Sequence, residues 1–454
     1  MKNDICAWID THKDVFESVA HYIWTHPEKS LEEYKASKKL SDLLEKNSFQ
    51  VDREVSDMPT AFIATFGQGK PVIAFNAEYD ALPGLSQKSG SNQKESLHEG
   101  ALGQGCGHNL LGTASVFAAI ALSEAIKKAE IEGTIKVFGS PAEELCIGKP
   151  FMARDGHYQL IDAFLDWHPW SYNKAHYDTC GAYFSIKYHF KGKTCHGNSP
   201  WHGRSAFDAA MLMGTAIEFL REHYEPDMSE RANTINYTFS DTGPSFPSIV
   251  PDKTTLWCIG RFNTSEQVEA IIKRIDQCAQ AGAIATETTY KKEYISATHE
   301  KIPNKVLSKI VYDNFAAIGT PQFTKEEQQL AKNMQENDGC EPTGLDTDLQ
   351  PFDTSGTALC DTSEMSWHAP YATFWMTAAP SGGWHNWKVV SCVGSSIGYK
   401  TMCQAAKVLA TSGWDVLRHP NIVLDAKSEF EHRLKGRAYK SLLPSDAHVP
   451  RQVR

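Results

Sequence analysis

The sequence lacks long apolar runs and an excess of positive charge, and each absence excludes a class of protein. No stretch of its 454 residues approaches the roughly 20 continuous apolar residues that a membrane-spanning helix needs. Its 45 lysines and arginines are outnumbered by 55 aspartates and glutamates, giving a net charge of −10. We therefore expect neither nucleic acid nor an anionic membrane as a partner.

A disulfide framework and a secretion signal are also missing from the pattern. The 11 cysteines are scattered and odd in number, which favours free thiols in a reducing compartment, with one available as a metal ligand. The first residues, MKNDICAWIDTHKDVF, carry acidic groups early and contain no apolar core followed by a cleavage site. We therefore expect a cytoplasmic protein.

The first part of the chain alternates between helical and strand patterns. The N-terminal segment predicts a helix that ends before Pro27 and has one apolar face. Ser30–Glu33 has a capping-box pattern and predicts a second helix to about Lys46. Apolar runs predict strands at residues 61–66, 72–77, 134–139 and 163–166, with a helix from about Asn109 to Lys128. This alternation indicates an α/β layer with a buried sheet. The face of the first helix comprises Trp8, Ile9, Val15, Phe16, Val19, Ala20 and Ile23.

A different rhythm begins at about Ala182. Period-2 alternation predicts a strand there, followed by a helix over 205–223, strands over 234–239 and 254–262, a helix over 265–281 and a last strand over 286–294. The order β-α-β-β-α-β is that of a ferredoxin-like α+β domain. We therefore expect an inserted domain at residues 182–299, and a discontinuous first domain made of 1–181 and 300–454.

Some segments give weaker signals. Residues 86–96 and 324–347 are polar, which predicts surface loops or flexible insertions. The tail after about Asp425 is charged and points to no function.

Five short motifs carry groups that can bind metal or transfer protons. They are EYDALP from Glu78, GCGHN from Gly105, PAEE from Pro141, DWHP from Asp166 and GGWH from Gly382. Four of them would lie at the carboxyl ends of predicted strands, where open α/β sheets bind their ligands. Each motif has an ordinary alternative, such as a solvated glutamate pair, a core histidine or a turn aspartate. Their joint appearance at strand ends favours a site.

The residue types in these motifs suit a catalytic metal site. Imidazole, thiolate and carboxylate are the usual zinc ligands, and a Cys-x-His turn between glycines can present both side chains to one place. Glu143 and Glu144 are adjacent, so on an extended loop they point in different directions. One carboxylate can then bind metal while the other takes a proton from attacking water.

These motifs occur in order with two more, CHGNSP from Cys195 and VGSSIGYK from Val393. In that set and order the chain resembles the dinuclear-zinc aminoacylase/carboxypeptidase family of amidohydrolases. Within the family it is most similar to the branch of p-aminobenzoyl-glutamate hydrolase B-subunits and indoleacetyl-amino-acid hydrolases. The resemblance extends to about residue 415. It implies a metal-dependent exopeptidase-like catalytic domain with an inserted lid and dimerisation domain, and hence a homodimer.

The resemblance also implies roles for individual residues. Glu143 becomes the general base and Asp80 an orienting catalytic residue. His196 corresponds to a lid histidine that reaches across the dimer to the scissile carbonyl. Arg261 matches an arginine that binds the substrate carboxylate, although a solvated strand-end charge is an equally good interpretation. Two divalent metal ions, Zn²⁺ or Mn²⁺, are implied, with Cys106, His108, Glu144, His168 and His385 as ligands.

The chain departs from the broader family pattern at three positions. Glu78 precedes Asp80 where many relatives have His-x-Asp, which affects the role expected of Asp80. Asn109 stands where relatives with a Cys-Gly-His motif often have aspartate, and Ser248 stands where they often have asparagine. None of these changes removes an expected ligand or the expected base.

The resulting expectation is hydrolysis of the amide bond of an N-acyl amino acid, of the p-aminobenzoyl-glutamate or indoleacetyl-aspartate type. The same fold would also suit a dipeptidase or a general N-acyl aminoacylase. A catalytically silent relative that binds a small molecule or serves as a partner subunit is an alternative of another class. An aromatic acyl group is suggested by four tryptophans near two expected ligands, although core packing explains them nearly as well. They are Trp167, Trp170, Trp384 and Trp387.

Overall fold

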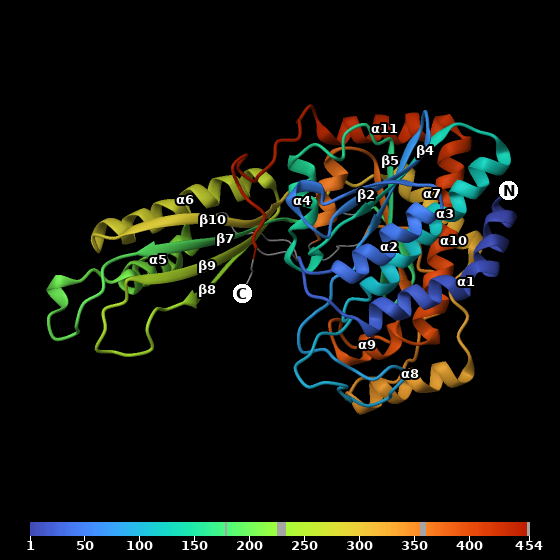
Figure 1. Cartoon of the computed structure of the whole chain (residues 1–454). Coiled ribbons are helices and arrows are strands. Elements are labelled where there is room, and N and C mark those ends of the chain that lie inside the picture. Colours follow the sequence, from blue (N-terminus) through green and yellow to red (C-terminus); the bar gives the residue numbers. More distant parts are fainter. Residues whose placement is uncertain (178, 225–232, 355–359, 452–454) are drawn as a thin grey trace.

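The computed structural model describes residues 1–454 except 178, 225–232, 355–359 and 452–454. It has a large body, in which helices cover a wide sheet, and a smaller elongated body on one side of it (Figure 1). The smaller body runs from Ala182 to Thr298, so the large body is built from the chain before and after it.

The large sheet has the strand order β1-β2-β4-β3-β5-β11-β6. Strands β4, β3, β5 and β11 are parallel to their neighbours within this group, whereas β1, β2 and β6 run antiparallel at the two sides. The parallel strands therefore end at one edge, and the segments that follow them meet there. The strands are β1 Gln50–Arg53, β2 Phe62–Gln68, β3 Val72–Ala77, β4 Gly133–Gly139, β5 Ala163–Trp170, β6 Lys174–His176 and β11 Tyr371–Thr377.

Alternate residues of the buried strands face two different cores. In β3, Ile73 and Phe75 pack into the larger core with most of the helices, whereas Ala74 faces the core beneath α4 (Gly148–Arg154) and the 3₁₀ helix η5 (Asp361–Trp367). The helices of the large core are α1 Lys2–Thr25, α2 Tyr34–Lys46, α3 His108–Ala129, α7 Lys305–Ile318, α8 Lys325–Asn337, α9 Trp387–Val393, α10 Ser396–Arg418 and α11 Pro420–Leu434.

Helix α3 is long and apolar enough to cross a membrane by length and composition alone. Its most apolar window is 94% buried inside the protein, between the sheet and the helices α1 and α10. This burial is typical of a core helix, and it holds the N-terminal end of α3 rigidly at the edge where the parallel strands end.

The smaller body has an antiparallel sheet of order β10-β7-β9-β8, with α5 (Ala206–Leu220) and α6 (Ser265–Ala285). In chain order the second strand lies beside the third, and the first lies between the third and the fourth. This confirms the predicted ferredoxin-like arrangement. The strands are β7 Ala182–Lys191, β8 Thr234–Asp241, β9 Lys253–Phe262 and β10 Thr289–Thr298. The last strand begins later than predicted because Thr286 still hydrogen-bonds back to Gly282 at the end of α6.

Several local predictions were wrong. The capping box at Ser30–Glu33 is not formed: α2 begins at Tyr34 with no side-chain cap, and the Ser30 hydroxyl donates to Asp80 instead. Residues 324–347 are not simply a loop, because Thr324 forms a real capping box with Glu327 and opens α8. Val15, expected on the buried face of α1, is 51% exposed. The tail after Asp425 continues as α11 to Leu434. The segment 86–96 lacks helix and strand, as predicted.

Candidate metal centre

Cys106 and His108 are held by the tight turn that opens α3. Gly107 between them has a φ of 81°, which only glycine adopts without strain, and a Cβ at this position would lie 2.8 Å from the Pro169 side chain. His108 is the first residue of the helix. The turn therefore presents a thiol and an imidazole together, as the Cys-x-His pattern predicts.

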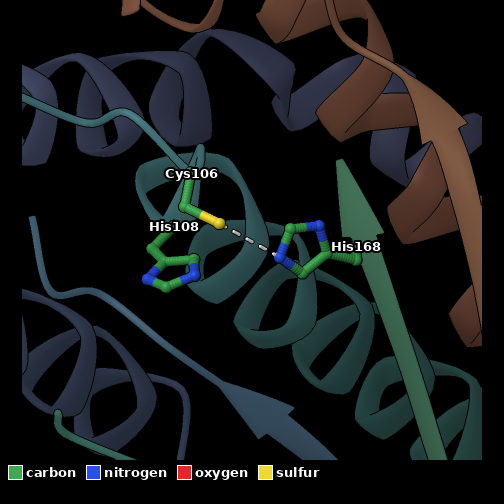
Figure 2. A group of neighbouring side chains, drawn as sticks. All are labelled: Cys106, His108 and His168. Atoms are coloured by element: carbon green, nitrogen blue, oxygen red, sulfur yellow. Dashed lines mark hydrogen bonds between the residues drawn. The ribbon is translucent and has the colours of Figure 1, made fainter. Parts of the chain in front are cut away.

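His168, near the end of β5, completes a first ligand group with these two residues. The ligand atoms of Cys106, His108 and His168 lie within 4.8 Å of one another. Figure 2 shows the Cys106 thiol between the two imidazole rings, with Sγ 3.4 Å from Nε2 of His168. Burial and the neighbouring His108 lower the pKa of His168 to about 4, which keeps this imidazole in the neutral form that binds metal.

A second ligand group shares Cys106 with the first. The ligand atoms of Cys106, Glu144 and His385 also lie within 4.8 Å of one another, and Nε2 of His385 is 3.6 Å from Oε2 of Glu144. Glu144 follows β4, whereas His385 comes from the loop after β11. Five residues from three strand ends and one helix start thus form two groups around one thiol. This is the arrangement that a pair of metal ions would need.

Glu143 points away from its neighbour Glu144, toward His108 and η5. Its Oε2 lies 3.6 Å from Nε2 of His108, and its Oε1 accepts a hydrogen bond from Sγ of Cys360 at 3.4 Å. The preceding Ala142 has a φ of 56°, which bends the chain between the strand and the two carboxylates. The pair therefore divides its directions as the sequence predicts: Glu144 joins the ligand groups and Glu143 lies beside them.

Asp80 orients the first ligand group from behind. Its Oδ1 lies 2.9 Å from Nδ1 of His108, and its Oδ2 accepts hydrogen bonds from the Ser30 hydroxyl and the Glu144 backbone N–H. An aspartate on Nδ1 leaves Nε2 of the imidazole free to face a metal ion. Asp80 itself belongs to neither ligand group, so the structure favours an orienting role.

The donor set fits divalent cations on electrostatic grounds. Nε2 of His108, Oε1 of Glu144 and Oε2 of Glu78 are buried and make no hydrogen bond with any residue that the structure describes. Burial raises the pKa of Glu144 to about 7, and burial together with Glu78 and Glu144 raises the pKa of Glu143 well above its usual range. Burial, assisted by Glu144, likewise raises the pKa of the Cys106 thiol. Two cations would satisfy the unpaired atoms and reverse these unfavourable interactions.

A buried polar network behind the ligands has no counterpart among the sequence predictions. Nζ of the fully buried Lys149 lies 2.8 Å from Oε1 of Glu78 and 2.6 Å from Oδ1 of Asp361. Oε2 of Glu78 reaches forward to within 3.4 Å of Nε2 of His108. In the sequence Glu78 is visible only as a departure from the family pattern. Lys149 lies within the apolar stretch IGKPFMA, where a paired lysine is not expected.

A cavity of about 470 Å³ opens beside the ligand groups. One end is aromatic: Trp170 stacks on Trp375 at 5.1 Å and lies 4.8 Å from Trp384 between ring centroids. The other end is lined by Tyr183, Tyr371, Arg261 and Lys301. Trp167 also lines the cavity, but Trp387 does not and instead donates from Nε1 to Asp338. The aromatic wall was therefore only partly predicted, since Trp375 replaces Trp387.

The two predicted residues of the smaller body take different positions. Arg261, near the end of β9, lines the cavity and lies over the ring of Tyr183, with 5.7 Å from Cζ to the ring centroid. His196 is exposed on the smaller body, where its Nδ1 accepts a hydrogen bond from the Asn198 backbone, and it does not line this cavity. The structure thus brings Arg261, but not His196, to the ligand groups of the same chain.

Known proteins agree with this fold and site. Residues 182–287 match the model of a peptidase dimerisation domain. The chain is 33% identical to the B component of p-aminobenzoyl-glutamate hydrolase from Escherichia coli (strain K12), over 96% of each chain. It is 26% identical to the Xaa-Arg dipeptidase of Mus musculus, over 96% of this chain and 93% of that one. The crystal structure of a dinuclear metal-binding peptidase of the M20 family from Bacillus subtilis superposes with a TM-score of 0.55 at 16% identity, over 89% of this chain and 99% of that one.

The chain belongs to the M20 family of metal-dependent peptidases and amidohydrolases. The resemblance inferred from the ordered motifs and the fold class predicted with it are therefore confirmed.

Proposed function

We propose that this protein hydrolyses the amide bond of an N-acyl amino acid with an aromatic acyl group, of the p-aminobenzoyl-glutamate or indoleacetyl-aspartate type. The observation that carries the proposal is the pair of ligand groups sharing Cys106, with Glu143 beside them and an aromatic cavity in front. The 33% identity to a component of a p-aminobenzoyl-glutamate hydrolase supports the same substrate class.

The two ligand groups would hold two divalent ions, Zn²⁺ or Mn²⁺. Cys106, His108 and His168 would bind one ion, and Cys106, Glu144 and His385 the other. When bound, these ions would supply Lewis-acid polarisation of the scissile carbonyl and make water acidic enough to attack near neutral pH. The sulfur and nitrogen donors suit zinc, whereas the carboxylate also admits manganese.

The chain's own residues would move the proton and orient the reactants. Oε2 of Glu143 faces the space beside His108 and is placed to accept the proton of the attacking water and then deliver it to the leaving amine nitrogen. Asp80 holds His108 through Nδ1 and so fixes the direction of Nε2. Arg261 would bind the carboxylate of the amino-acid portion, for which a bidentate guanidinium is suited.

The aromatic end of the cavity supports an aromatic acyl group. Three tryptophans lie within stacking distance of one another, next to His168 and the loop that carries His385. Flat rings of this kind bind another ring through a large apolar area and offset stacking. An acyl ring placed there would position its carbonyl toward the ligand groups.

The assembly is part of the proposal. The dimerisation-domain match and apolar side chains exposed on the smaller body, such as Trp201, Phe219 and Ile284, support a homodimer formed through this domain. In such a dimer His196 of one chain would polarise the carbonyl in the cavity of the other. The Escherichia coli relative is named as one component of its enzyme, which leaves room for a further, different partner chain. We also propose a cytoplasmic location, supported by the scattered free thiols.

Two alternatives use specific observations. The identity to Xaa-Arg dipeptidases supports a dipeptidase, and a general N-acyl aminoacylase would need the same ligands. However, Arg261 and Lys301 at one end of the cavity would repel an arginine side chain. A catalytically silent relative would have no need for the pairing of Glu143 with Cys360 beside complete ligand groups.

The test is release of p-aminobenzoate from p-aminobenzoyl-glutamate by purified protein. Activity should disappear after chelation and return with Zn²⁺ or Mn²⁺, and N-acetyl amino acids and Xaa-Arg dipeptides serve as competing substrates. Faster hydrolysis of Xaa-Arg than of aroyl-glutamate would favour the dipeptidase. No release from any amide after metal addition would favour the silent relative.

A further inference from the structure

Lys301 is a buried cation for which the described part of the chain supplies no anionic partner. It lies just after β10, where the chain returns to the large body, and its backbone N–H donates to the Cys180 carbonyl. The residue is 5% exposed, and its Nζ lies over the Tyr371 ring at 5.3 Å. Among the residues outside the gaps at 178, 225–232, 355–359 and 452–454, no ion pair or hydrogen bond connects Nζ to another residue.

Lys149 shows what this protein does with a lysine that has only a structural role. Lys149 is equally buried, yet its Nζ contacts two carboxylates, those of Glu78 and Asp361. A buried ammonium without such partners is unfavourable by several kcal/mol in general. The difference between the two lysines therefore indicates that the partner of Lys301 comes from outside the chain, through the cavity that it lines.

The position of Lys301 in the cavity defines which part of a substrate it would meet. Tyr371, Thr373 and Trp375 are alternate residues of β11 that all line the cavity, so this strand spans it from the cation end to the aromatic end. Four residues of strand correspond to about 13 Å. An aromatic ring at Trp375 would thus place the far end of an N-acyl amino acid near Tyr371 and Lys301.

The cation end contains two positive side chains of different origin. Arg261 comes from β9 of the smaller body, and Lys301 from the connection between the bodies. An amino acid released by amide hydrolysis always has an α-carboxylate, which Arg261 alone can bind. A second cation is useful when the same amino acid has a second carboxylate.

We propose that Lys301 binds the side-chain carboxylate of an acidic amino acid and makes this enzyme selective for N-aroyl dicarboxylic amino acids. This inference rests on the proposed function and narrows its substrate class. Lys301 is a specificity-determining residue, whereas Arg261 binds the carboxylate that every substrate of this kind shares.

The experiment compares p-aminobenzoyl-glutamate with p-aminobenzoyl-glutamine, which differs by one charge. Wild-type holoenzyme should prefer the glutamate conjugate in kcat/KM by roughly 10- to 100-fold, the usual effect of one charged hydrogen bond. Lys301→Met should remove this preference by raising KM for glutamate alone, while Lys301→Arg should keep most of it. Lys305→Met is the matched control, because Lys305 also lies over a tyrosine ring but does not line the cavity.

Each outcome decides a different statement. A preference that survives in Lys301→Met, or that falls equally in Lys305→Met, would overturn the role of Lys301. Hydrolysis of neither conjugate would overturn the proposed function instead. In that case tryptophan fluorescence during titration with L-glutamate and L-glutamine tests Lys301 directly: tighter binding of L-glutamate to wild type than to Lys301→Met supports the subsite, and equal binding refutes it.

Discussion

Cys360 donates a hydrogen bond from Sγ to Oε1 of Glu143 at 3.4 Å, and the Thr362 hydroxyl donates to the same sulfur at 3.2 Å. The chain Thr362–Cys360–Glu143 fixes one oxygen of the carboxylate and leaves the other to face His108. A thiol is a weak donor, so it can orient this carboxylate without greatly lowering its basicity.

Removing that donor should therefore reduce turnover rather than binding. We expect Cys360→Ala to lower kcat by about 3- to 10-fold, the loss of one modest hydrogen bond, with KM and metal content unchanged. Cys360→Ser restores a donor and should recover most of the rate. Equal losses in both variants would show that the size of the sulfur, and not its hydrogen bond, matters.

The two adjacent glutamates should behave differently when each loses its charge. Glu143→Gln should retain metal and lower kcat by about 10²- to 10⁴-fold, because the amide cannot accept the proton of water. Glu144→Gln should instead reduce the number of metal ions bound, measured by elemental analysis after dialysis. Wild-type turnover in Glu143→Gln would remove it as the base.

Cys106 belongs to both ligand groups, and its replacement should affect both ions. Cys106→Ala is expected to show a lower metal stoichiometry than His168→Ala, which removes a ligand from one group alone. Cys392→Ala is the control, since Cys392 is fully buried among apolar side chains and belongs to neither group. Normal metal occupancy in Cys106→Ala would contradict its assignment as a ligand.

The buried Lys149 should be important for stability. Lys149→Met would leave Glu78 and Asp361 buried without their cation, and we expect a loss of about 3–5 kcal/mol in the free energy of unfolding. Adding Asp361→Asn to Lys149→Met should recover part of that loss, because one uncompensated charge disappears. Urea denaturation of the single and double variants measures both. An unchanged midpoint in Lys149→Met would show that water or metal compensates the carboxylates.

Much of the fold could be predicted because local pattern and burial agree. Strands β3 and β4 are apolar runs, and their length and flanking residues identify them. Helix α8 was missed because it is mostly polar, with little buried surface beyond Ala331 and Met334. The false capping box shows the reverse case: Ser30 has the right spacing, but its hydroxyl has a stronger partner in the Asp80 carboxylate.

The site was predicted to a similar depth for a physical reason. Metal ligands at the ends of parallel strands must converge, so spacing alone brought together His168 and Glu144, and the family resemblance added roles. Residues whose importance lies in long-range pairing give no such signal. Lys149 and Asp361 are 212 positions apart and meet only in the folded chain. Lys301 becomes recognisable only in the folded structure, where the described residues leave its ammonium group unpaired.

The pair His299–Glu364 predicts how stability changes with pH away from the metal centre. Burial lowers the pKa of His299, but its Nδ1 lies 2.8 Å from Oε1 of Glu364, and that negative charge raises the pKa above the ordinary value of 6.5. The stabilisation by the protonated ring is therefore fully present below about pH 6.5 and is lost as the pH rises through the folded-state pKa. Burial raises the pKa of Glu364, but His299 and the neighbouring donors lower it by more, so the carboxylate remains charged throughout this range.

The wild type should accordingly exceed His299→Gln in unfolding free energy by more at about pH 6 than at about pH 9. The ring also packs against Trp367 and Tyr439, so a pH-independent difference remains at high pH. Urea titrations at several pH values measure both parts, with His98→Gln as a control because His98 is exposed and far from this pair in sequence. A difference that stays constant from acid to base would mean that His299 is neutral in the folded protein and that packing alone accounts for its contribution.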